Sequence, residues 1–197
     1  MNLEGRALFT IALAVLLSRP RAISAGVFLI ALSTSAFAFA DEVSIGRPKI
    51  LHEMKIAPVY LQAVPTDPEG GSWGPPPDKS DLHLEVDITA TRGNRHGFKP
   101  GSFVPALTIH YTLTHIPTGS SEEGELWAMV AKDGPHYGIN VKMRGSGRYR
   151  LTLLVQPPDR TGFGRHTDRE TGVPAWWEPF EVSWEFTYPA TSATRSR

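Results

Sequence analysis

Beyond residue 40, apolar and polar residues alternate along the chain with a period of two rather than 3.6. This alternation is typical of strands that bury one face. The clearest example begins at Phe180, where Phe180, Val182 and Trp184 share one face and polar residues lie between them. Alternation, or enrichment in strand-forming residues, predicts strands at residues 56–63, 82–91, 108–114, 126–131, 149–156 and 180–188.

Clusters rich in Gly, Pro, Asn, Asp and Ser separate these segments and mark turns. Beyond residue 40 the sequence has no capped amphipathic helix of three turns. A series of short strands separated by turns predicts an all-β fold, an immunoglobulin-like antiparallel β-sandwich, although the Cys–Trp–Cys pattern of antibody domains is absent. The turn clusters fall at residues 65–81, 92–102, 117–124, 133–135, 145–147 and 157–174.

The first forty residues follow a different pattern. Two apolar runs, 7–17 and 25–40, are separated by a short basic segment. Neither run provides about twenty uninterrupted apolar residues, the length needed to cross a bilayer. The second run ends in alternating Ala and Phe up to Ala40, as at a signal peptidase site. We therefore expect residues 1–40 to be a cleaved signal peptide, with an uncleaved anchor as the alternative.

Cleavage after Ala40 leaves residues 41–190 as a single domain and residues 191–197 as a frayed tail. The full chain has 197 residues, with 20 Lys and Arg against 20 Asp and Glu, and no Cys. The balanced charge argues against nucleic acid as a partner. Without Cys there are no disulfides or thiolate ligands, so any soft metal ligand must be Met or His. An exported, cysteine-free chain fits a bacterial periplasm.

The motifs of several common enzyme classes are missing from the sequence. It contains no GxSxG nucleophile elbow, no GxGxxG or Walker loop, and no HExxH zinc motif. These absences favour a binding protein over an enzyme, so we expect no catalytic residues and turn to metal-ligating side chains.

His83 and Glu85 lie two residues apart in a predicted strand and therefore project from the same face. An imidazole beside a carboxylate is a compact pair of ligands for a divalent metal ion. The alternative is a solvent-facing polar stripe that alternates with buried Leu82, Leu84 and Val86.

Met129 and His136 flank a turn predicted at residues 133–135. A chain reversal there brings the two side chains close together. A thioether beside an imidazole suits copper, above all Cu(I), because sulfur is soft and polarizable. Met129 alone is more often a core residue of an apolar strand, whereas a histidine on a Gly/Pro corner has fewer ordinary explanations.

His166 lies in a glycine-containing stretch, GFGRH at residues 162–166. Glycines allow unusual backbone angles and can present one imidazole ring to a site. An exposed loop histidine is the alternative. The remaining histidines, His52, His96, His110 and His115, are interpreted as surface or packing residues.

Five collinear segments of the chain resemble the periplasmic iron-transport family, whose members accompany high-affinity ferrous-iron permeases. Their consistent order and spacing carry the resemblance over residues 44–188. The segments are IAPVYLQ at 56–62, LHLEVD at 82–87, a Gly- and Pro-rich stretch at 94–109, LWAMVAKDGPHYG at 126–138, and 162–180 with GFGRH, ETGV and WEPF.

The resemblance implies a homodimeric immunoglobulin-type sandwich with a metal site near the dimer interface. It implies that copper is held by His83, Met129, His136 and His166, the last contributed either by the same subunit or by the partner subunit. Glu85 adds a site for a second metal, or for iron or its surrogate manganese in place of copper. Lys132 departs from the small or acidic residue expected beside Asp133.

The expected function is therefore periplasmic binding of copper and iron during iron uptake with an inner-membrane iron permease. A copper chaperone or resistance protein without an iron role is the main alternative, and an interaction sandwich with incidental histidines is a further one. Trp176 and Trp177 follow the His166 stretch, and exposed rings there would support a homodimer interface.

Overall fold

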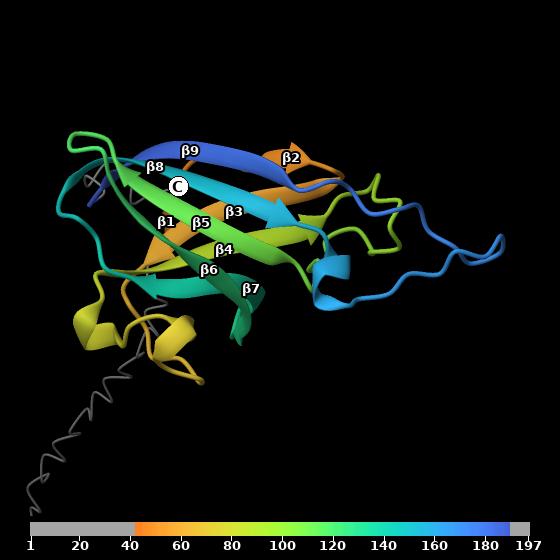
Figure 1. The fold of residues 1–197 in the computed structure, drawn as a ribbon, viewed down its shortest axis with the longest axis horizontal. Helices are drawn as coiled ribbons and strands as arrows, with labels where there is room; N and C mark the ends of the chain where they lie inside the picture. The colour runs from red at the N-terminus through yellow and green to blue at the C-terminus, as the bar shows by residue number, and fades with distance from the viewer. Residues whose placement is uncertain (1–41, 190–197) are drawn as a thin grey trace, which may run out of the picture. The chain divides into compact units, whose positions relative to one another are not determined.

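The computed structural model describes residues 42–189, which form an antiparallel β structure with three short 3₁₀ turns (Figure 1). Residues 1–40 and 191–197, assigned above to a signal peptide and a tail, lie outside this range. Within it, no helix is long and apolar enough to span a membrane. The strands are β1 (Val43–Ser44), β2 (Lys49–Leu51), β3 (Met54–Leu61), β4 (Leu82–Ala90), β5 (Thr108–His115), β6 (Ser120–Ala131), β7 (Gly134–Val141), β8 (Gly147–Gln156) and β9 (Phe180–Tyr188), and the turns are η1 (Gly71–Trp73), η2 (Pro77–Lys79) and η3 (Pro158–Thr161).

The strands are hydrogen-bonded in the order β1-β3-β4-β7-β6-β5-β8-β9, with β2 also paired to β3. The long strand β6 joins the two halves of this arrangement. Its first part pairs with β5 through residue 126, and its last part pairs with β7 from residue 127 onward. The sheet curls so that β3–β4–β7 and β5–β8–β9 cover one another (Figure 1).

One hydrophobic cluster fills the space between the two halves. The aromatic rings of Tyr60 on β3 and Phe186 on β9 lie 5.9 Å apart, so β3, next to one end of the strand order, meets β9 at the other end. The indole nitrogen of Trp184 donates a hydrogen bond of 2.9 Å to the carbonyl oxygen of Arg47, which fixes the same edge. These contacts confirm the all-β, antiparallel sandwich expected from the alternating pattern.

Strand β7 was not predicted, because its sequence begins with a Gly-Pro pair that is typical of a turn. In the structure the β6–β7 turn consists of Lys132 and Asp133, and Gly134 already pairs with Ala131. His136 therefore lies within a strand rather than on a corner. The turn predicted at residues 117–124 was also too long, because β6 begins at Ser120.

Candidate metal centre

The outward face of β4, β7 and β6 brings the candidate ligands together. The β4–β7 register places Asn140 opposite His83 and Gly138 opposite Glu85. The β6–β7 register places Met129 directly opposite His136. Directly paired residues point to the same side of a sheet, so these side chains share one face.

This polar face is buried, although it lies outside the hydrophobic core. His83, Glu85 and His136 are 1%, 6% and 4% exposed. The alternative of a solvent-facing stripe at His83 and Glu85 is therefore wrong. The connection between β3 and β4 passes over this face, and its residues Val64 and Trp73 line the same cavity as the three polar side chains.

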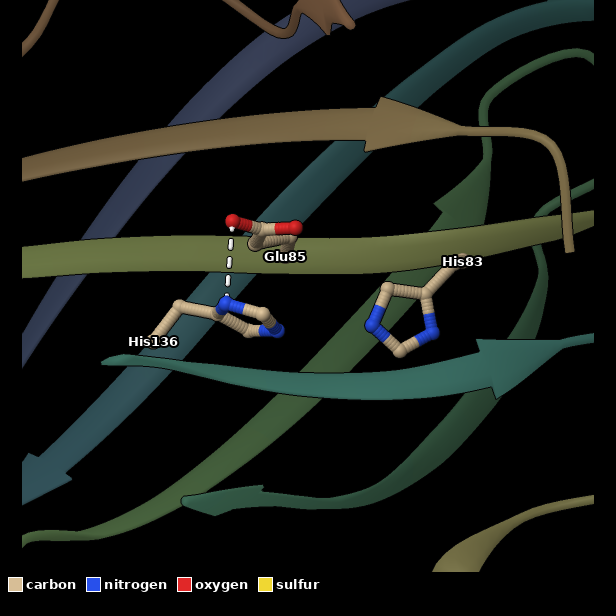
Figure 2. Close-up of side chains that lie close together, drawn as sticks. All are labelled: His83, Glu85 and His136. Carbon is tan, nitrogen blue, oxygen red and sulfur yellow. Dashed lines mark ion pairs between the residues drawn. The ribbon is translucent and has the colours of Figure 1, made fainter. Parts of the chain in front are cut away.

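The three buried side chains converge on a small volume (Figure 2). One ligand atom from each of His83, Glu85 and His136 lies within 4.8 Å of the others. The His136 Nδ1 atom lies 3.3 Å from Glu85 Oε1, and the two imidazole rings are 5.9 Å apart at an interplanar angle of 79°. The Nε2 atoms of both histidines are buried without a hydrogen-bond partner. Unpartnered buried nitrogens are costly, and a bound metal ion would satisfy both.

Burial decides the protonation states of this cluster. Desolvation lowers the pKa of His83 to about 4, and it also lowers the pKa of His136. Desolvation, reinforced by the charges of Glu42, Asp87 and Asp133, raises the pKa of Glu85 to about 8. At neutral pH both imidazoles are therefore neutral, and the raised pKa of Glu85 favours its protonated form, so the close approach of Glu85 and His136 is not a full ion pair. Neutral imidazole is the form that binds metals.

The cluster opens into a cavity of about 520 Å³. His83, Glu85, Met129 and His136 all line this cavity, so the structure brings together four of the five ligands expected from sequence. Much of the remaining wall is apolar. Trp73 contributes to it and stacks on Trp127 with ring centroids 4.7 Å apart.

A group of carboxylates adjoins the cluster on the far side of Glu85. Glu42 and Asp133 approach Glu85 closely enough that all three could ligate one ion. Burial, reinforced by the charges of Asp133 and Asp87, raises the pKa of Glu42. The pKa of Asp87 is raised mainly by burial. Hard oxygen donors of this kind suit iron or manganese better than Cu(I).

His166 is not brought to this cluster. It is exposed in the connection between η3 and β9, and its Nδ1 atom lies 2.7 Å from Thr171 Oγ1. Figure 1 shows this connection extending beyond the end of the sheet opposite η1 and η2. Within one subunit, His166 is therefore not a ligand of the site formed by His83 and His136.

Trp176 and Trp177 are packed within the subunit rather than exposed at an interface. Trp177 is buried, and Trp176 is half-buried against the ring of His96 at a centroid distance of 5.4 Å. The expectation of an exposed ring is wrong for Trp177, whereas Trp176 keeps part of its surface exposed. The exposed aromatic residue of this connection is Phe163, which is 41% exposed.

Four residues around the cluster were missed by sequence reasoning. Gly138 and Asn140 reach it through the pairing of β7 with β4, and Glu42 comes just before β1, which pairs with β3. These strands are distant in sequence, which leaves no local signal. Asp133 carried a signal, because it lies four residues after Met129 in the turn before His136, but it was interpreted only as a turn residue. Lys132 is exposed in that same turn.

Comparison with known proteins identifies the family to which the chain is similar. Residues 39–190 match the family described as Fe2+ transport protein. The chain is 46% identical over 165 residues to a UPF0423 protein of Brucella abortus, covering 82% of this chain and 90% of that protein.

Two solved structures extend the comparison to copper-binding proteins. A copper-bound variant of FetP from uropathogenic Escherichia coli is 49% identical, with a TM-score of 0.73 over 76% of this chain and 99% of the other. The copper-reconstituted P19 protein of Campylobacter jejuni is 46% identical, with a TM-score of 0.72 over 75% and 96% of the two chains. The resemblance inferred from the five sequence segments is thereby confirmed.

Proposed function

Since the chain belongs to the Fe2+ transport protein family, we propose that it is a periplasmic metal-binding protein of iron uptake that holds copper and iron at one centre. The single observation that carries the proposal is the pair of buried, unpartnered Nε2 atoms on His83 and His136, facing one cavity beside Glu85. An arrangement of this kind is costly to an apo fold and is relieved by a cation. We propose a binding and delivery role rather than catalysis.

Copper is assigned to the softer donors. His83 and His136 supply neutral nitrogens, and Met129 supplies a thioether directly opposite His136. This donor set is uncharged and soft, which favours copper and in particular Cu(I). The copper-bound relatives support this assignment. Bound copper would supply a one-electron redox couple beside the iron site.

Iron is assigned to the harder side of the same centre. Glu85 faces both the histidines and the carboxylates of Glu42 and Asp133, so it is the residue shared by the two donor sets. Manganese should substitute for ferrous iron in binding experiments, because both prefer oxygen ligands. The acidic side of the centre favours this role over that of a copper chaperone without iron.

We assign His166 to the centre of a partner subunit in a symmetric homodimer. The exposed stretch around Phe163 and His166 offers an apolar ring and an imidazole, and the cavity offers apolar walls and a metal centre. Two copies related by a two-fold axis would exchange these contacts reciprocally. The iron would pass from this dimer to an inner-membrane permease.

Export through residues 1–40 completes the proposal, and the exported protein should begin at or near Asp41. N-terminal sequencing checks this, since an intact Met1 in the membrane fraction contradicts it.

The metal assignment is tested by titrating the exported protein with Cu(I), Cu(II) and Mn(II). The proposal requires that copper and manganese both bind, and that His83→Ala and His136→Ala each weaken copper. His110→Ala is the control, because His110 is exposed on β5. Equal copper affinity in all three variants would contradict the proposal that His83 and His136 bind copper.

A further inference from the structure

Asn140 is a buried asparagine with hydrogen bonds in several directions. It lies on β7 directly opposite His83 and is 2% exposed. Its side chain contacts both the imidazole of His83 and the backbone of the connection that passes over the metal centre.

Three backbone groups determine the orientation of this amide. The Nδ2 group donates to the carbonyl oxygens of Val64 at 2.8 Å and Pro75 at 3.2 Å. The Oδ1 atom accepts the backbone N–H of Val64 at 3.2 Å. A rotated amide would place its oxygen against two carbonyl oxygens and its NH₂ group against an N–H, losing all three bonds. The oxygen therefore faces His83.

The orientation of the amide determines the tautomer of His83. Oδ1 of Asn140 lies 3.1 Å from Nδ1 of His83 and has no hydrogen, so Nδ1 must be the donor. A neutral imidazole carries one N–H, and therefore Nε2 of His83 has a free lone pair. This is the same Nε2 atom that is buried without a partner.

We propose that Asn140 is a positioning residue of the metal centre: it holds His83 in the Nδ1–H tautomer, leaves Nε2 as the ligating atom, and joins that ring to the connection of residues 62–81. The role of Asn140 in metal binding rests on the proposed function, whereas the hydrogen bonds and the tautomer of His83 do not depend on it. A ligating histidine is commonly oriented by a hydrogen bond at its other nitrogen, and loss of such a bond typically costs about 10–100-fold in metal affinity. Here the same amide also holds Val64 and Pro75.

The proposal is tested first without metal. Long-range ¹H–¹⁵N NMR of the metal-free protein at pH 7.5 distinguishes the two neutral tautomers of each histidine. The wild-type protein should show His83 as Nδ1–H. The Asn140→Asp variant keeps an acceptor toward His83 and toward the Val64 N–H, and loses the two donations to the carbonyl oxygens of Val64 and Pro75, so it should keep the tautomer at a cost in stability. The Asn140→Leu variant has no acceptor and should lose the single tautomer.

Asn94 offers a matched control. It also bonds to three backbone groups, those of Glu53, His96 and Phe98, but it lies in the connection after β4. The Asn94→Leu variant should cost stability and leave the His83 tautomer unchanged. Cu(I) affinity should fall about tenfold or more in Asn140→Leu and stay within about twofold in Asn94→Leu.

Different results would contradict the role of Asn140 and the proposed metal-binding function. An Nε2–H tautomer in the wild-type protein overturns the role of Asn140, and this measurement needs no variant. A tautomer unchanged in folded Asn140→Leu overturns it as well. Failure of the wild-type protein to bind copper would instead contradict the proposed function while leaving the tautomer result intact.

Discussion

The Nε2 atom of His83 occupies space that Gly138 leaves open, because a Cβ atom on residue 138 would lie 2.5 Å from it. Gly138 is paired with Glu85 on β4 and with Trp127 on β6, in the middle of the outward face. A residue without a side chain at this point lets the imidazole lie over the strand. Gly138 thus shapes the centre without ligating.

The substitution Gly138→Ala should therefore displace the His83 ring. We expect copper affinity to fall about tenfold or more, and stability to fall by about 1–3 kcal/mol from overpacking. Isothermal titration and chemical denaturation measure the two effects. Gly93→Ala is the control, because a Cβ atom there meets no neighbouring atom within 4 Å. Unchanged copper affinity in Gly138→Ala would contradict this account of the ring position.

The two sides of the centre should be separable by substitution. Met129→Leu conserves apolar volume and removes the sulfur, so Cu(I) affinity should fall about tenfold while Mn(II) affinity stays nearly unchanged. Glu85→Gln should do the reverse. His136→Ala should weaken both metals, because His136 contacts Glu85 and lies opposite Met129. If Met129→Leu and Glu85→Gln lose the same metals equally, the centre is not divided in this way.

The raised pKa of Glu85 predicts a pH dependence of stability in the metal-free protein. Its pKa is about 8 in the fold against 4.5 as the ordinary value, so the folded state retains a proton that the unfolded chain releases. The contribution of Glu85 to the free energy of unfolding is then fully present below pH 4.5, and it is lost as the pH rises toward and through 8. The free energy of unfolding should fall by up to about 1.4 kcal/mol per pH unit between pH 6.5 and 8.

Between pH 6.5 and 8, the effect of Glu85 on stability is also separated from that of His83. The pKa of His83 is lowered to about 4, so its contribution is lost as the pH falls below 6.5 and is constant above that value. Urea denaturation of the wild-type protein and Glu85→Gln at several pH values measures the difference. In Glu85→Gln the free energy of unfolding should no longer fall with pH between 6.5 and 8. An identical pH dependence in both proteins would assign it to other groups.

A mixing experiment tests whether His166 acts across the dimer. His136→Ala and His166→Ala homodimers should each bind copper weakly. Mixed dimers would combine His136 of one subunit with His166 of its partner, restoring about a quarter of the sites if subunits exchange freely. As the control, His136→Ala mixed with Met129→Leu should restore nothing, because both of these ligands come from one chain. Absence of restoration in the first mixture contradicts ligation by the partner subunit.

The ligands close in sequence were predictable, and those joined by long-range pairing were not. The alternation of β4 placed His83 and Glu85 on one face, and the turn after β6 brought Met129 to His136 seven residues later. The β4–β7 pairing spans about fifty residues, so nothing local indicated that Gly138 and Asn140 would lie opposite Glu85 and His83.

Burial was the property that the sequence pattern misjudged most. An alternating strand predicts one solvent-exposed face, yet His83 and Glu85 are buried because the connection from β3 to β4 passes over them. In the opposite direction, Trp176 and Trp177 were expected to be exposed and instead pack on His96. Both differences arise from long connections, whose paths do not follow from residue periodicity.

The most direct test of the metal centre is anomalous X-ray diffraction at the copper edge from crystals of the copper-loaded protein. The account predicts a peak within bonding distance of the Nε2 atoms of both His83 and His136, with Met129 beside it. A copper peak coordinated by neither imidazole, in a protein that is fully loaded, would contradict it.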